Sequence, residues 1–253
     1  MRYTAPPVGR APRTLYGLSV KLDGKIALIT GGGRGIGKAV ALAYARASAK
    51  LAICARTAGE IEAAAKEIRA LGAECLALPC DVAQEDQVKK LVDEVVKKFG
   101  RIDVLINNAG VMTRPTPVTE YDASKWDYTM AVNLRGPFLM AKAVLPVMFK
   151  NGGGSIVNVS SSIGRGAYAN FAAYGASKWG LEGFTQILAA EVGGRKVRVN
   201  SVEPGYVATK LTGFHGSAPE SVTEVFVFLG SDEGSHVSGH MLSSSSWRSE
   251  LKK

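Results

Sequence analysis

The chain has 253 residues, of which 46% are hydrophobic and 21% are charged, a composition typical of a globular protein with additional glycine. This composition excludes a disordered or collagen-like chain, and no run approaches the roughly 20 apolar residues that a bilayer span needs. The formal net charge of +9 does not indicate nucleic-acid binding, because the excess lies mostly near the two ends and elsewhere Lys and Arg are interspersed with Asp and Glu.

The first residues differ in composition from the rest of the chain. Residues 1–21 contain three prolines and no acidic residue, which favours a flexible arm. A mitochondrial-type transit peptide is the alternative, although prolines disfavour the amphipathic helix that such a signal needs. Cys54, Cys75 and Cys80 are too few for a disulfide framework and favour a reducing, cytoplasmic location.

From residue 22 onward, short apolar segments alternate with stretches of helical periodicity. Strands are predicted at residues 25–30, 51–55, 74–78, 104–106, 155–160 and 197–202. Helices are predicted at residues 36–47, 61–71, 88–99, 123–150 and 172–192. Strands that are apolar throughout and separated by helices form a parallel sheet covered on both faces. We therefore expect an α/β fold with a doubly wound parallel sheet in a single domain, residues 22–242, followed by a polar tail, residues 243–253.

A glycine-rich segment, Thr30-Gly31-Gly32-Gly33-Arg34-Gly35-Ile36-Gly37, follows the first predicted strand and opens the first predicted helix. Glycines in this context let the backbone turn tightly and approach a pyrophosphate, whose charge is met by free N–H groups at the helix N-terminus. A simple turn is the alternative. The flanking strand and helix favour dinucleotide binding.

The end of the second predicted strand bears on the choice of cofactor. A fold that prefers NAD carries an acidic residue there to hold the ribose hydroxyls. The sequence at this point is Cys54-Ala55-Arg56-Thr57, which contains no acid. Arg56 and Arg34 would attract the 2′-phosphate of NADP, so the sequence favours NADP (NADPH) over NAD. A solvated Arg56 at a helix start is the alternative.

Tyr174 and Lys178 are four residues apart on a predicted helix, so they lie on one face. A tyrosine with a pKa near 10 is a poor acid at neutral pH, and a neighbouring ammonium group would lower that pKa toward the working range. Alone, such a pair is more often accidental surface chemistry. Here it belongs to a larger series of motifs.

That series also includes Asn107-Asn108-Ala109-Gly110, Asn133, Ser161 and Pro204-Gly205, which follow the glycine loop in one order along the α/β pattern. With these motifs the sequence resembles the short-chain dehydrogenase/reductase family over residues 22–212, and the resemblance implies a Rossmann-type fold. It also implies four catalytic residues: Asn133, Ser161, Tyr174 and Lys178. Tyr174 would be the general acid and Ser161 would bond the substrate oxygen. Lys178 would serve the phenol and the nicotinamide ribose, and Asn133 would kink its helix and hold a water.

The same resemblance implies the contacts to the cofactor. Asp81 matches a contact to adenine, and Val207 and Thr209 match groups that hold the carboxamide. The complete set of implied cofactor-binding residues is Thr30, Gly31, Arg34, Gly35, Ile36, Gly37, Arg56, Asp81, Val82, Asn108, Ala109, Gly110, Lys178, Pro204, Gly205, Val207 and Thr209.

The sequence departs from the family pattern in two places. Only residues 211–218 precede Pro219-Glu220, where the family has a helical lid, so we expect a bare loop and an open pocket. After Leu242 the chain continues with four serines, residues 243–246. We therefore expect weak burial of the last strand, a disordered tail and a reduced tendency to form the dimer or tetramer that the resemblance suggests.

The remaining special residues suggest no further site. The histidines lack metal-ligand spacing, so no metal is expected, and the tryptophans are expected to pack in a core or an interface. These residues are His215, His236, His240, Trp126, Trp179 and Trp247. The sequence thus favours an NADPH-dependent oxidoreductase acting on a small ketone, aldehyde or ketoacyl group, with no nucleic-acid or membrane partner. A sugar or polyol dehydrogenase and a non-catalytic NADP-binding sensor or partner subunit are the alternatives.

Overall fold

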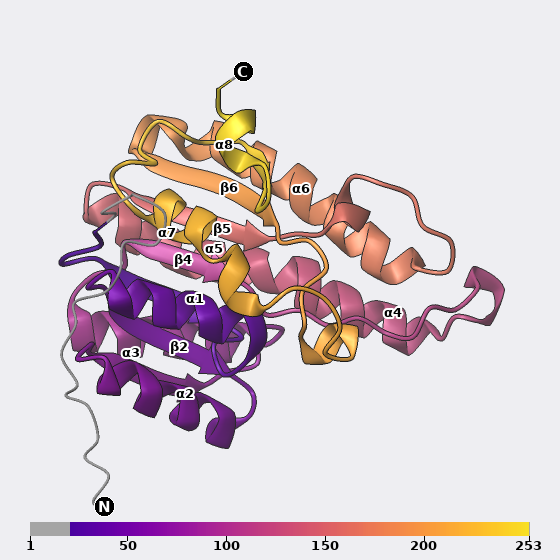
Figure 1. Ribbon diagram of the computed structural model, residues 1–253, viewed down its shortest axis with the longest axis horizontal. Coiled ribbons are helices and arrows are strands. Elements are labelled where there is room, and N and C mark those ends of the chain that lie inside the picture. Colours follow the sequence, from indigo (N-terminus) through magenta and orange to yellow (C-terminus); the bar gives the residue numbers. More distant parts are fainter. Residues whose placement is uncertain (1–20, 253) are drawn as a thin grey trace, which may run out of the picture.

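The computed structural model describes residues 21–252, and within them the strands form one parallel sheet (Figure 1). The spatial order is β3-β2-β1-β4-β5-β6-β7. The strands are β1 (Ile26–Thr30), β2 (Lys50–Ala55), β3 (Cys75–Pro79), β4 (Val104–Asn107), β5 (Gly154–Val159), β6 (Val197–Glu203) and β7 (Met241–Ser243). The six predicted strands are confirmed to within one residue at each end. The predicted arm at residues 1–21 lies outside the described residues, apart from Lys21.

Helices cover both faces of the sheet (Figure 1). They are α1 (Gly35–Arg46), α2 (Ala58–Ala70), α3 (Glu85–Phe99), α4 (Ala123–Met130), α5 (Gly136–Lys150), α6 (Ala172–Val192), α7 (Glu224–Gly230) and α8 (Trp247–Glu250). One core joins α1, α2, α7 and α8 to the sheet, and the other joins α3, α5 and α6. Within β1, Ala27 and Ile29 belong to the first core and Ile26 and Leu28 to the second, because successive side chains of a strand point to opposite faces. The fold is the predicted doubly wound, Rossmann-type sheet.

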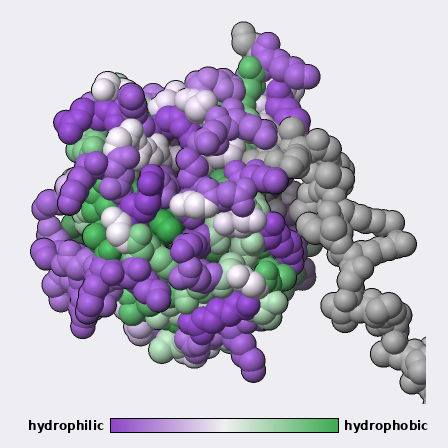
Figure 2. Space-filling view, turned by 90° about the vertical axis from the view of Figure 1, so that its left-hand side faces the viewer, coloured by the Kyte–Doolittle hydropathy of each residue, from purple (hydrophilic) through white to green (hydrophobic). Residues whose placement is uncertain are grey.

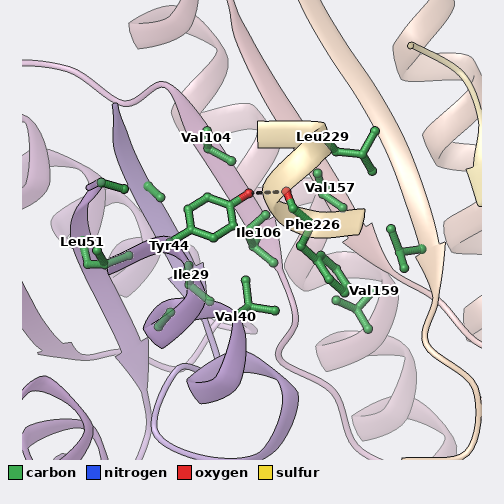
Figure 3. Close-up of a cluster of buried hydrophobic side chains, with 14 of the residues drawn as sticks. Ile29, Val40, Tyr44, Leu51, Val104, Ile106, Val157, Val159, Phe226 and Leu229 are labelled. Carbon is green, nitrogen blue, oxygen red and sulfur yellow. Dashed lines mark hydrogen bonds between the residues drawn. The ribbon is translucent and has the colours of Figure 1, made fainter. Parts of the chain in front are cut away.

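Figure 3 shows how α1 is fixed to α7 inside the first core. The side chain of Tyr44 is fully buried, and its hydroxyl donates a hydrogen bond to the carbonyl oxygen of Phe226 at 2.6 Å. Burial raises the pKa of Tyr44, so the phenol stays a neutral donor. A Cβ atom at Gly230 would lie 2.3 Å from this hydroxyl, so only glycine leaves room for it. The helix that begins at the glycine loop is thereby anchored at its far end.

The predicted continuous helix at residues 123–150 is interrupted in the structure. Helices α4 and α5 are separated by a π-helical segment, Ala131–Arg135, which contains the buried Asn133. The Asn133 amide donates to the Val111 carbonyl at 2.8 Å and its oxygen accepts from the Val111 N–H, also at 2.8 Å. The wider turn lets one side chain satisfy both backbone groups of an extended residue. These two hydrogen bonds connect the segment after β4 to the π-helical segment.

The expectation of a disordered tail from residue 243 is wrong for residues 243–252. Strand β7 pairs with β6, and Trp247 of α8 is 5% exposed, with its ring 4.5 Å from that of Phe228. The Ser243 hydroxyl donates to a carboxylate oxygen of Glu203 at 3.0 Å, and the Ser244 N–H donates to the Glu203 carbonyl at 2.9 Å. Serine can therefore replace apolar residues here, because its hydroxyls bond to the neighbouring strand.

The surface carries paired charges of both signs. Lys38 bonds Glu67 at 2.7 Å and Lys89 bonds Asp93 at 2.7 Å, and all four side chains are at least partly exposed. On the face shown in Figure 2, hydrophilic residues surround several patches of hydrophobic ones, as is usual for globular proteins. None of the helices in residues 21–252 is long and apolar enough to cross a membrane.

Candidate active site

The carboxyl ends of the parallel strands border one cavity of about 660 Å³. The strand order reverses between β1 and β4, so the loops after these two strands diverge to opposite sides of the sheet. Ligands of doubly wound folds bind at such a point. The cavity runs from the ends of β2 and β3, past the glycine loop, to the ends of β5 and β6.

The glycine loop lies against its neighbours with no room for side chains. Gly31 and Gly35 have φ angles of +66° and +53°, which L-residues rarely adopt. A Cβ atom at Gly37 would lie 2.3 Å from the Gly31 carbonyl oxygen and 2.4 Å from the Asn108 amide nitrogen. The start of α1 can therefore approach the loop this closely only with glycine at position 37.

Thr30 and Asn108 hold this loop from behind. The Thr30 hydroxyl accepts the backbone N–H groups of Asn108 and Ala109, each at 3.0 Å. The Asn108 amide donates to the carbonyl oxygens of Thr30 at 2.9 Å and Gly31 at 3.2 Å. Asn108 was expected to lie along the cofactor; it lines the cavity, but its amide donors are engaged by the glycine loop.

The two arginines expected to attract a 2′-phosphate are not equivalent. Arg34 pairs with the carboxylate of Glu60 at 2.6 Å, so an opposite charge already accompanies it. Arg56 has no carboxylate partner among residues 21–252: its guanidinium donates to the hydroxyl of Tyr128 on α4 and lies 5.7 Å from the centre of that ring. Arg56 lines the cavity, so its positive charge remains available to an anion there.

The other end of the cavity contains Ser161, Tyr174 and Lys178. Tyr174 is 9% exposed, and burial raises the pKa of its phenol although a hydrogen bond with Ser161 lowers it. That Lys178 lowers the pKa of Tyr174 stays a prediction. The Lys178 ammonium donates to the Val159 carbonyl at 2.7 Å and lies 5.6 Å from the centre of the Tyr174 ring. Burial lowers the pKa of Lys178 to about 8.

Most residues that the sequence assigned to the site line this cavity. Those on its wall are Gly31, Arg34, Gly35, Ile36, Arg56, Asp81, Val82, Asn108, Ala109, Gly110, Ser161, Tyr174, Lys178, Pro204, Gly205, Val207 and Thr209. Thr30, Gly37 and Asn133 do not reach the wall. They act on it from behind, through the contacts described above. Asn133 also donates to the hydroxyl of Ser177 at 3.1 Å, which joins its helix to α6.

Beside the polar Ser160, Ser162, Lys210 and Thr212, the cavity wall includes apolar side chains that the sequence did not identify. They are Val111, Met112, Ile163, Phe171, Tyr206 and Leu211. The acidic residues that line the cavity are Glu60, in the first turn of α2, and Asp81, in the loop after β3. The apolar residues of the wall, from Val111 to Leu211, come from four separate segments without a motif, so only the fold brings them together.

The short lid is a compact loop. A single 3-10 turn, Lys210–Thr212, is the only helical part of residues 209–218. The Thr212 hydroxyl donates to the Val207 carbonyl at 2.6 Å and accepts the Thr209 N–H at 3.0 Å, and residue 207 forms a bridge with residue 217. Phe214 is 72% exposed at its tip. The loop is thus closed on itself, and one short turn takes the place of a helical lid.

The described residues contain no group of three or more His, Cys, Asp or Glu side chains that could hold a metal ion. Of the tryptophans, Trp247 packs in the core, whereas Trp126 and Trp179 are 37% and 55% exposed. Neither of these two lines the cavity.

The comparisons with known proteins agree with this geometry. A family model described as short chain dehydrogenase matches residues 25–219. The chain belongs to the short-chain dehydrogenase family. It is 38% identical over 240 residues to the 3-oxoacyl-(acyl-carrier-protein) reductase FabG of Thermotoga maritima, covering 88% of this chain and 97% of that one. It is 40% identical over 236 residues to D-threitol dehydrogenase of Mycolicibacterium smegmatis, covering 87% and 90%.

Solved structures of the family are also similar, and two of them contain nicotinamide cofactors. Carveol dehydrogenase from Mycobacterium avium, in complex with NAD, has a TM-score of 0.84 and 27% identity, covering 88% of this chain and 96% of that one. A short chain dehydrogenase from Shigella flexneri complexed with NADP has a TM-score of 0.85 and 28% identity, covering 90% and 100%. This chain is accordingly an oxidoreductase that acts on alcohol or carbonyl groups with a nicotinamide cofactor.

Because Lys178 is buried, we predict that its charge lowers the stability of the fold. A lysine whose pKa is about 8 in the folded chain and 10.5 ordinarily disfavours folding at pH values below 8, where both states bind the proton. Lys178→Met should therefore raise the free energy of unfolding at neutral pH by about 1–3 kcal/mol. The gain should shrink as the pH rises from about 8 to about 10.5, because the wild-type lysine then loses its charge.

Urea unfolding of the two proteins at about pH 7 and about pH 9.5 measures this difference. Lys150→Met, at an exposed position at the end of α5, is the matched control and should change stability little at either pH. A destabilised Lys178→Met variant at pH 7, or a gain that does not fall with pH, would contradict the prediction.

Proposed function

We propose that the chain is an NADP(H)-dependent reductase that transfers a hydride between the nicotinamide and the carbonyl group of a small ketone, aldehyde or ketoacyl compound. The observation that carries the proposal is the presence of Ser161, Tyr174 and Lys178 at one end of the cavity and a glycine cradle and free Arg56 at the other. The intact donor set favours an enzyme over a non-catalytic sensor.

The residues of the cavity fit a dinucleotide. The positive φ angles of Gly31 and Gly35 and the close approach at Gly37 expose backbone N–H groups beside the start of α1, where a pyrophosphate is stabilised. Asp81 follows β3 on the cavity wall, with its carboxylate oriented by the Ala83 N–H at 3.0 Å, and would meet the adenosine. The side chain of Thr209 packs against Gly35.

The preference for NADP rests on Arg56. Arg56 lines the cavity and has no carboxylate partner in the described part of the chain, so a 2′-phosphate would gain a charge-assisted hydrogen bond there. Glu60 opposes this effect, because its carboxylate neutralises Arg34 and repels a phosphate. The two arginines therefore contribute unequally to the preference.

The chemistry at the other end follows from charge development. The bound nicotinamide supplies or accepts the hydride. As a carbonyl is reduced, negative charge builds on its oxygen, and hydroxyl donors aimed at that oxygen stabilise it. Ser161 and Tyr174 are such donors, and the phenol of Tyr174 carries the proton that the oxygen needs; burial opposes the release of that proton, and the hydrogen bond with Ser161 favours it. Lys178 would support the phenol and hold the nicotinamide ribose.

The apolar wall around Ser161 and Tyr174 favours an uncharged carbonyl compound with an apolar body. Burying a polyol against Met112, Ile163 and Phe171 would leave its hydroxyls without partners. The second candidate, a polyol dehydrogenase, is favoured by the 40% identity to D-threitol dehydrogenase. Kinetics on both substrate classes distinguish the two.

We predict that the wild-type chain oxidises NADPH in the presence of apolar ketones or a ketoacyl thioester, and that Tyr174→Phe abolishes this turnover while retaining NADPH binding. The phenyl ring still packs in the wall, but it has no proton to donate. Tyr168→Phe, at a residue that is 55% exposed and off the cavity wall, is the control and should keep full activity.

The assay follows NADPH absorbance over a series of ketones and, in the reverse direction, NADP-dependent oxidation of four-carbon polyols. Turnover of polyols alone would favour the second candidate. Tight NADPH binding without turnover on any compound would instead favour a sensor, and substantial activity of Tyr174→Phe would exclude Tyr174 as the acid.

Cofactor selectivity provides a second prediction. Arg56→Ala should weaken NADPH binding by about 10- to 100-fold and leave NADH binding nearly unchanged, because one charge-assisted bond is lost. Glu60→Gln should strengthen NADPH binding by about 3- to 10-fold, because Arg34 is released from its carboxylate partner.

Fluorescence titration of both cofactors on each variant measures these changes. Arg46→Ala removes an exposed arginine at the far end of α1 and controls for the loss of overall charge. Equal affinity of the wild type for NADPH and NADH would contradict the preference for NADP.

A further inference from the structure

A second ionisable side chain lies buried on the catalytic helix. Glu182, one turn after Lys178 on α6, has a side chain that is 5% exposed. One carboxylate oxygen accepts a hydrogen bond from the Ser201 hydroxyl of β6 at 2.5 Å, and the other has no hydrogen-bond partner among the described residues. A buried carboxylate is costly unless cations compensate its charge. The groups around Glu182 should therefore indicate the role of its carboxylate.

Two cations lie near this carboxylate. The Arg165 guanidinium nitrogen is 3.9 Å from the oxygen without a hydrogen bond. Lys178 lies on the same face of the helix, and Glu182 raises the pKa of its ammonium against the larger, opposite effect of burial. Tyr174 and Glu182 of α6 and Arg165 of the segment after Ser161 are the titratable or charged groups on this side of the helix. The charged side chains of the other elements packed on α6 are engaged elsewhere or exposed: Arg198 and Arg135 donate to the Gly234 and Ala83 carbonyls, Glu203 accepts from Ser243, and Lys125 and Asp127 are exposed. Ser160, Ser201 and Asn133 complete the surroundings with groups that do not titrate.

The segment after Ser161 packs directly on this helical turn. A Cβ atom at Gly164 would lie 3.0 Å from the Ser160 hydroxyl, 3.2 Å from the Lys178 carbonyl oxygen and 3.3 Å from the Cγ atom of Glu182. Arg165 follows Gly164 immediately, so its guanidinium reaches Glu182 from the same segment that begins with Ser161. The carboxylate thus lies on or next to the segments that carry Ser161, Tyr174 and Lys178.

We propose that Glu182 is a positioning residue of the active site, whose buried carboxylate places a negative charge one helical turn from Lys178 and holds Arg165, and with it the Ser161 segment, against α6. The Ser201 hydroxyl fixes the carboxylate from the sheet. The proposal rests on the function proposed above for the role of Lys178, but the protonation of Lys178 itself is measurable without any substrate. In Glu182→Gln the amide keeps the shape of the side chain and loses its charge, so burial acts on Lys178 without compensation.

The test is the titration of Lys178, followed by NMR of the full-length chain labelled at the lysine Cε carbon and assigned with Lys178→Met. The wild-type midpoint is expected near 8. Glu182→Gln should lower it by about one pH unit, the effect of removing one nearby opposite charge. Glu182→Asp, which retains the charge, should stay close to the wild type. Glu191→Gln, at an exposed glutamate on the same helix, should leave the midpoint unchanged.

Arg165→Gln gives a test that does not depend on the folding of Glu182→Gln. Arg165 is partly exposed, and its guanidinium competes with Lys178 for the carboxylate. Removing it should raise the Lys178 midpoint by a few tenths of a unit, opposite in sign to the effect of Glu182→Gln. An unchanged midpoint in Glu182→Gln, an equal shift in Glu182→Asp, or no rise in Arg165→Gln would overturn the proposal.

The pH profile of kcat/KM is the second readout. If catalysis requires a charged Lys178, the alkaline limb of the kcat/KM profile should move to lower pH together with the NMR midpoint in Glu182→Gln. In Glu191→Gln neither should move. A purely structural role would lower kcat/KM at every pH without moving the limb, and that result would also overturn the proposal. Absence of turnover in the wild type would contradict the proposed function, whereas the NMR titration would still decide the role of Glu182.

Discussion

The candidate cofactor site depends on the closeness of three backbone segments at the start of α1. The Gly31 carbonyl and the Asn108 amide occupy the space where a side chain at position 37 would begin. This contact holds the glycine loop, the first turn of α1 and the end of β4 together, and the Thr30 hydroxyl completes it. Because Tyr44 bonds Phe226 at the other end of α1, the helix cannot move to relieve the crowding.

The opposite end of the cavity is organised by buried charge. Lys178 and Glu182 are each about 5% exposed, and between them they supply one positive and one negative charge beneath a mostly apolar wall. Hydrophobic side chains of similar size would stabilise the fold more, since burial opposes both charges. Under the proposed function their presence follows from the chemistry: a buried phenol that donates a proton would need a cation held close to it and kept in its charged form.

Much of the fold and the site could be predicted because the determinants are local. The apolar strands and the glycine loop are contiguous in sequence, and Tyr174 and Lys178 are four residues apart on one helix, so periodicity and spacing place them. The pairing of Arg34 with Glu60 and of Arg56 with Tyr128 could not be predicted in this way. Each joins side chains from separate segments, and only the three-dimensional contact shows that one arginine is neutralised and the other is not.

Two other features depended on context that the sequence does not display. The serines after Leu242 indicate weak burial by composition, yet the Ser243 hydroxyl donates to Glu203, the Ser244 hydroxyl donates to the Pro204 carbonyl, and the following Trp247 packs in the core. The helical periodicity of residues 123–150 conceals the π segment, whose cause is the bonding of Asn133 to both backbone groups of Val111. In each case a long-range hydrogen bond prevails over the local pattern.

The most direct test of this account is the affinity for NADPH, measured calorimetrically, of Gly37→Ala and Gly59→Ala. A Cβ atom at Gly37 would collide with the Gly31 carbonyl, whereas at Gly59, on α2, nothing lies within 4 Å. The account predicts that Gly37→Ala weakens NADPH binding by at least about tenfold, because the loop must shift, and that Gly59→Ala binds NADPH as the wild type does. Wild-type affinity in a folded Gly37→Ala variant would contradict it.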